Sequence, residues 1–182
     1  MLTTPIKKTY QDYRELPDEN RYELIEGEIL MTPSPSLFHQ KVAHRLNQSI
    51  SNHVARNNSG DVYFAPLDVV LSEHNVVQPD ILFVSNKRKA ILKEENIQGP
   101  PDLVVEITSR ASLERDRLIK KALYARYGVQ EYWLVDLEKG CIEVLSLKNS
   151  DYQLIGIFFS EDFLSTPLFP DFNLPVGPIF SM

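Results

Sequence analysis

The feature that most constrains this chain is an apolar segment, 102–108, that carries an acidic residue, Glu106, at its centre. A charged carboxylate inside a predicted core strand is costly unless a cation or hydrogen-bond donors satisfy it. A helical pattern follows over 111–127 and ends at Gly128, and another strand pattern covers 131–136. Strand patterns that alternate with long helical ones indicate a mixed α/β domain rather than an all-helical or all-β one.

The rest of the chain supports the same class. An apolar stripe with a four-residue period predicts a helix over 37–56. The other expected elements are a short helix at 10–15, a hairpin over 21–30 turned at Glu26-Gly27, strands at 62–64, 67–71, 80–84, 141–147 and 152–159, a helix or loop over 86–99, and an irregular tail from Asp162. With 182 residues and no linker that divides them, we expect one domain, 1–182.

Composition limits the class of protein. Hydrophobic residues make up 43% and charged residues 24% of the sequence, as in globular domains. The first residues have no apolar signal core, and no apolar run approaches the roughly 18–20 residues that cross a bilayer. The single cysteine, Cys141, excludes an intrachain disulfide and a multi-cysteine metal cluster. We therefore expect a cytoplasmic protein with no membrane partner.

The net charge of −6 by itself disfavours nucleic acid as a partner, but this charge is unevenly distributed. Residues 1–126 hold 17 basic and 17 acidic side chains, whereas 127–182 hold two basic and eight acidic ones. Between Ile29 and Gly60 there is no acid. The basic residues Lys41, Arg45 and Arg56 form a second face of the predicted helix, either a solvated surface or a surface for phosphates.

Three ionisable residues are candidates for a catalytic site. Asp80 follows Pro79 at the start of an apolar strand, Glu106 lies within another, and Lys120 shares a helix face with Asp116. Two carboxylates on neighbouring strands form an oxygen-rich site for a hard cation such as Mg²⁺, and an ammonium beside them can orient water or stabilise phosphate charge. Singly, Asp80 could cap a turn, Glu106 could reach solvent from an edge strand, and Lys120 could form a surface ion pair.

Several segments, taken in order, resemble the Uma family of endonuclease-like proteins. They are Arg-Tyr-Glu-Leu-Ile-Glu-Gly-Glu-Ile (21–29), Pro-Ser-Pro-Ser-Leu-Phe-His (33–39), Val-Val-Gln-Pro-Asp-Ile (76–81), Pro-Asp-Leu-Val-Val-Glu-Ile-Thr-Ser (101–109) and the stretch from Asp116 to Asp136. The resemblance covers about 10–172. It implies the PD-(D/E)xK nuclease superfamily and a restriction-endonuclease-like core: a central mixed sheet flanked by helices, with an N-terminal helix and hairpin.

The resemblance also assigns roles to residues. Asp80 matches the motif aspartate, Glu106 the acid of the (D/E)xK element, and Glu28 an additional acid near the site. Thr108 stands where the superfamily has lysine, and the family supplies its lysine from the next helix, where Lys120 matches and Lys121 is the neighbouring alternative.

From this we predict a metal-dependent DNA endonuclease. Mg²⁺ or Mn²⁺ is expected on Asp80, Glu106 and the Ile107 carbonyl, with no organic cofactor. Lys120 is expected to position or help deprotonate the attacking water. Phosphates are expected on the basic residues Lys41, Arg45, Arg56, Lys87, Arg88 and Lys89, and a homodimer suits the cutting of two strands.

Two other functions stay open. Thr108 in the lysine position and the modest basic charge are compatible with an inactive nuclease fold that acts as a DNA-binding or protein-interaction module. The tail aromatics Phe163, Phe169, Phe172 and Phe180 are expected to be exposed, which is compatible with a structural oligomer.

Overall fold

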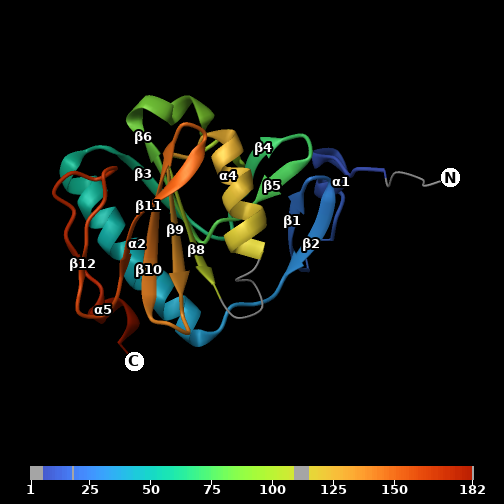
Figure 1. Ribbon diagram of the computed structural model, residues 1–182. Coiled ribbons are helices and arrows are strands. Elements are labelled where there is room, and N and C mark those ends of the chain that lie inside the picture. The colour runs from blue at the N-terminus through green and yellow to red at the C-terminus, as the bar shows by residue number, and fades with distance from the viewer. Residues whose placement is uncertain (1–5, 18, 109–114, 182) are drawn as a thin grey trace.

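A six-stranded mixed sheet forms the centre of the computed structural model, which describes residues 6–17, 19–108 and 115–181 (Figure 1). Its strand order is β11-β10-β9-β8-β6-β3. The strands are β3 (Gly60–Phe64), β6 (Ile81–Ser85), β8 (Leu103–Thr108), β9 (Glu131–Asp136), β10 (Cys141–Lys148) and β11 (Asp151–Phe158). Only the central pair, β8 and β9, runs parallel among these described strands, and the neighbouring pairs are antiparallel.

A second, smaller sheet lies beside one end of the first and has the order β2-β1-β5-β4-β7 (Figure 1). It contains β1 (Arg21–Ile25), β2 (Glu28–Thr32), β4 (Val69–Ser72), β5 (Asn75–Val77) and β7 (Ile97–Gln98), and the short helix α1 (Tyr10–Arg14) precedes it. The turn between β1 and β2 places Glu26 and Gly27 at positive φ, as a tight hairpin requires. The sequence indicated these strands without separating them into two sheets.

Each face of the central sheet has its own apolar core. Helix α2 (Leu37–Asn57) covers one face, because its stripe of Val42, Leu46, Ile50 and Val54 is buried against β6, β8, β9 and β10. On the other face, the π-helical turn η2 (Asp116–Lys120) continues into α4 (Lys121–Tyr127), and α4 packs with β1, β4 and β5 over the sheet. Side chains that alternate along β8 therefore point to different cores.

The C-terminal segment closes the α2 side of the sheet. Its strands β12 (Phe163–Leu164) and β13 (Leu174–Pro175) pair with each other, and α5 (Gly177–Phe180) follows. The aromatic rings of Phe169 and Phe172 are 3% and 6% exposed, because they pack against Phe83, His53 and Trp133. The expectation that the tail presents a row of exposed aromatics is therefore wrong; of the four, only Phe163 is a largely exposed ring.

The expected fold class is confirmed: a mixed α+β arrangement with a central mixed sheet flanked by helices. The segment 86–99 becomes the 3₁₀ helix η1 (Asn86–Ile91) followed by β7. The start of the helix predicted over 111–127 lies outside the described residues as far as 114. No helix in the described part of the chain is both long enough and apolar enough to cross a membrane.

Candidate active site

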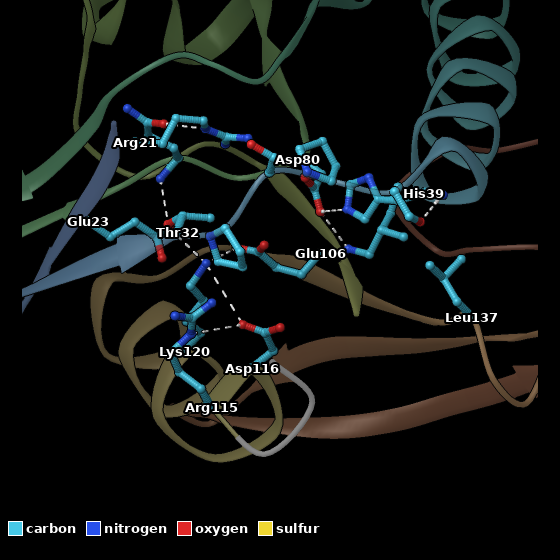
Figure 2. A pocket seen from close by; sticks show the side chains of 16 residues that line it. Arg21, Glu23, Thr32, His39, Asp80, Glu106, Arg115, Asp116, Lys120 and Leu137 are labelled. Atoms are coloured by element: carbon cyan, nitrogen blue, oxygen red, sulfur yellow. Dashed lines mark hydrogen bonds and ion pairs between the residues drawn. The ribbon is translucent and has the colours of Figure 1, made fainter. Parts of the chain in front are cut away.

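A cavity of about 310 Å³ opens at the end of the central sheet where β6 begins and β8 ends (Figure 2). It lies between the start of α2, the hairpin strand β1 and the turn η2. Its polar lining comes from both sheets and both flanking helices: Arg21, Glu23, Thr32, Ser34, Ser36, His39, Gln78, Asp80, Glu106, Arg115, Asp116 and Lys120. Residues far apart in the sequence thus meet in one polar hollow.

Asp80 is fixed by the main chain of the neighbouring strand. Its Oδ2 accepts a hydrogen bond from the Ile107 N–H at 2.8 Å, and its own main-chain carbonyl accepts the Ala65 N–H at 3.1 Å. The Nε2 atom of His39, in the first turn of α2, lies 3.3 Å from the same Oδ2. Because Ser36 caps this helix start through the His39 N–H, the imidazole is held over the carboxylate.

Glu106 lies on the other side of the cavity, on β8, and shares one cation with Glu23 of β1. The Lys120 ammonium donates to Glu106 Oε1 at 3.0 Å and to Glu23 Oε1 at 2.8 Å, and it lies 3.9 Å from Asp116 Oδ1 (Figure 2). The Tyr124 hydroxyl donates to Glu106 Oε1 at 2.6 Å. All of these side chains are buried, and Lys120 is only 3% exposed.

The electrostatics of this group follow from burial and from its excess of acids. Burial raises the pKa of Glu106 to about 8, with the negative charges of Asp116, Glu23 and Asp80 acting in the same direction and only Lys120 opposing them. Burial alone would also raise the pKa of Glu23, but the Lys120 charge and hydrogen bond outweigh it and the pKa is lowered. Burial disfavours charged Lys120, yet the surrounding carboxylates raise its pKa, so it stays an ammonium.

The donor set suits a hard divalent cation. Asp80 and Glu106 supply carboxylate oxygens from neighbouring strands, and Glu23 Oε2 is buried with no hydrogen-bond partner among the described residues. Three carboxylates, those of Glu23, Glu106 and Asp116, lie at ion-pair distance from the Lys120 ammonium, and this local excess of negative charge favours a second cation. The described residues contain no group of three His, Cys, Asp or Glu side chains arranged to enclose a metal. Mg²⁺ can be held by one or two carboxylates, with water and phosphate oxygens completing its shell.

The structure does not bring Glu28 to the cavity. It is exposed on β2, directly opposite Ile25, and is not part of the cavity lining. The buried acid of the hairpin is Glu23, which is 1% exposed and was not among the predicted site residues. Its signal was present in the sequence, since Glu23 lies among Tyr22, Leu24 and Ile25, just as Glu106 lies among apolar neighbours.

Thr108 and Lys121 do not take the lysine position. The Thr108 hydroxyl donates to the Val135 carbonyl at 3.1 Å, so it is used in binding β9. Lys121 follows the turn that carries Lys120 and is absent from the cavity lining. Of the two adjacent lysines, Lys120 is the one that reaches Glu106.

The six basic residues predicted to contact phosphate do not form one surface around the cavity. Lys41 is exposed two residues after His39, but Arg56 lies about 22 Å further along α2 at 1.5 Å per residue. Lys87, Arg88 and Lys89 follow the far end of β6, about 20 Å from Asp80 at 3.3 Å per residue.

Four of these six make contacts within the protein. Arg56 donates to the Asn52 carbonyl at 3.3 Å, and Lys89 lies 3.5 Å from Asp61. Arg45 donates to the carbonyls of Ile179 and Ser181 and thereby holds the C-terminal segment. Arg88 donates to the Pro100 carbonyl at 3.0 Å and lies 3.3 Å from Asp102. Among the described residues, the cations that line the cavity besides Lys120 are Arg21 and Arg115, and no sequence pattern had pointed to either of them.

Comparison with known proteins places this geometry in a family. No curated protein matches the sequence. The structure is similar to the crystal structure of a "putative nuclease belonging to DUF820" from Anabaena variabilis, with a TM-score of 0.79 and 21% sequence identity over 97% of this chain and 98% of the other. At this identity the likeness shows the fold. The Uma2 model, described as "Putative restriction endonuclease", matches residues 10–177, and the chain therefore belongs to the Uma2 family.

Proposed function

We propose that this protein is a metal-dependent endonuclease that hydrolyses DNA phosphodiester bonds. The observation that carries the proposal is the convergence of Asp80, Glu106 and Lys120 on one cavity, from two strands and a helix. Membership of the Uma2 family supports a nuclease, and the acid-rich, oxygen-donating character of the cavity supports a divalent cation.

Mg²⁺ or Mn²⁺ would be held by Asp80, Glu106 and the Ile107 carbonyl, and when bound it would acidify a water and offset charge on the phosphate. Lys120 has a raised pKa and stays protonated, so its part is to orient the water and stabilise negative charge. Glu23 takes the supporting place expected of Glu28, because it holds the Lys120 ammonium at 2.8 Å. Tyr124 is a positioning residue that fixes Glu106.

Phosphates on either side of the reacting bond would meet the cations at the cavity rim. Arg21 and Arg115 line the cavity, and Lys41 is exposed two residues after His39 on α2. Binding through such contacts should weaken steeply with salt. Two copies of the chain would be needed to cut both strands together, so the proposed active form is a homodimer.

One observation favours the alternative, an inactive nuclease fold that binds DNA or a protein. The Lys120 ammonium already has Glu23 and Glu106 as partners, and the usual lysine position holds Thr108, which binds β9. If a metal and a phosphate cannot displace these contacts, the cavity would bind DNA or a protein without cutting DNA.

Cleavage of supercoiled plasmid in Mg²⁺ or Mn²⁺ tests the proposal. Wild-type protein should nick the plasmid, and Asp80→Asn, which keeps the size of the side chain, should slow nicking by about 100- to 1,000-fold. Lys121→Met serves as the matched control and should cut at the wild-type rate. Nicking that persists in Asp80→Asn would come from a contaminant and refute the site, whereas DNA binding by a wild-type protein that never cuts would favour the inactive module.

A further inference from the structure

A second cavity, of about 360 Å³, adjoins the first. The two share Arg21, Pro35, His39 and Asp80, so a molecule bound at Asp80 in one can extend directly into the other. The second cavity lies between the first turns of α2 and the end of β3, on the α2 side of the sheet. Its volume is within the roughly 300–1,000 Å³ of pockets that bind small organic groups.

An exposed aromatic ring forms one wall. Phe64 is the last residue of β3, which is an edge strand, and its register partner is Ile81, the residue after Asp80. Alternation along the strand puts Phe64 on the same face as Val62, which packs against the α2 core. The ring is nevertheless 62% exposed, so most of its surface is available to another molecule.

The opposite wall is a polar stripe of α2. Gln40, Ala43, His44 and Asn47 recur at spacings of three and four residues and therefore share a helix face. Asn47 Oδ1 is buried and accepts no hydrogen bond from the described residues. A buried amide oxygen normally has a partner, so this one is available to a donor on a bound molecule.

We propose that the second cavity is a subsite for an unpaired nucleobase of the nucleic-acid strand, next to the phosphodiester bound at Asp80. This proposal rests on the proposed function and adds to it that the base beside the reacting bond is unpaired. An aromatic face accepts any base by stacking, and side-chain amides bind the hydrogen-bonding edges of bases. Those edges are free only when the base is unpaired, as in a single strand, a loop or a flipped nucleotide.

Arg21 fits between the two parts of such a ligand. It lines both cavities and is held by Gln78, whose Oε1 accepts from its Nε at 3.1 Å. The phosphate that links a base in one cavity to the reacting bond in the other would pass this guanidinium. Ala43 lies in the helix stripe between Gln40 and Asn47, and its small side chain leaves room for a planar ring against Phe64.

The test is the affinity for a labelled single-stranded oligonucleotide, measured by fluorescence anisotropy in Ca²⁺ with a gel to check that the strand is intact. Phe64→Ala should raise the dissociation constant by about 5- to 150-fold, the range for loss of one base–aromatic stack. Phe64→Trp should preserve the affinity. Phe163→Ala is the matched control, since Phe163 is 59% exposed on the C-terminal segment, and it should bind as the wild type does.

Fluorescence of the Phe64→Trp variant gives a second readout. The native Trp133 is fully buried, so quenching on addition of the oligonucleotide reports stacking at position 64. A wild-type protein that binds the strand, with Phe64→Ala binding as tightly as Phe163→Ala, would overturn the subsite and leave the proposed nuclease intact. A wild-type protein that binds no nucleic acid at all would overturn both.

Discussion

Replacing Lys120 by methionine tests the electrostatic argument at its centre. The substitution keeps the length of the side chain and removes the charge that Glu23 contacts at 2.8 Å. Without the ammonium, buried Glu23 has to take up a proton to fold. Since pH 7 lies 2.5 pH units above the ordinary Glu23 pKa of 4.5, protonating this carboxyl costs about 3 kcal/mol. This agrees with the roughly 3–5 kcal/mol lost when one partner of a buried ion pair is removed.

The cost should depend on pH in a direction fixed by the sign of the shift. In Lys120→Met the folded pKa of Glu23 is raised, so the folded state holds a proton that the unfolded chain releases above pH 4.5, and stability falls as pH rises. In the wild type the pKa of Glu23 is lowered, and its contribution is constant above pH 5. Glu106, with a pKa of about 8, is mostly protonated in both proteins, so its contribution cancels in the difference between their unfolding free energies. The difference in unfolding free energy should therefore be about 3 kcal/mol at pH 7 and below about 1 kcal/mol at pH 5.

Urea unfolding followed by circular dichroism at pH 5 and pH 7, in EDTA, measures this difference. Lys121→Met is the matched control, because it removes a lysine that does not line the cavity and should change stability by less than about 0.5 kcal/mol. A loss in Lys120→Met that is the same at both pH values, or no larger than that of Lys121→Met at pH 7, would refute the reasoning.

Two further substitutions probe the parts that support the site. Tyr124→Phe removes the donor 2.6 Å from Glu106 and should destabilise the fold by about 1–3 kcal/mol, while raising the pKa of Glu106 as followed by carbon NMR; an unchanged pKa would contradict the hydrogen bond. Leu46→Ala opens the buried stripe between α2 and the sheet and should cost about 2–5 kcal/mol in urea unfolding, whereas Leu37→Ala at the exposed start of the same helix should cost little. Equal losses for the two leucines would argue against the packing of α2.

Much of the site could be predicted because its acidic residues lie in or beside apolar strands, where charged side chains are unusual. Glu106 lies in an apolar strand and Asp80 opens another, so each calls for a partner that the sequence does not place beside it. The family resemblance then pointed to Lys120, on the helix after the strand. These residues are separated by short stretches with strong periodicity, and the fold of each stretch follows from its own pattern.

The errors concern contacts between distant segments. Arg45 donates hydrogen bonds to carbonyls 134 and 136 residues later, and Arg88 donates to the loop before β8. Neither arginine therefore forms the expected phosphate surface. Glu28 and Glu23 belong to the same hairpin, and only the packing of β1 against η2 determines which one is buried. Local charge patterns do not determine which charged groups the tertiary fold brings together.

The parallel pairing of β8 with β9 has a consequence for how such a site can change. Parallel neighbours need a return path along the sheet, and Lys120 belongs to that connection, whereas Glu106 belongs to the strand itself. The position of Glu106 is therefore fixed by strand register. The position of Lys120 is fixed by how η2 and α4 pack on one face of the central sheet. A mutation that rotates or shifts this helix would move the Lys120 ammonium without disturbing the strands. The position of the lysine can therefore change independently of the position of the strand carboxylate.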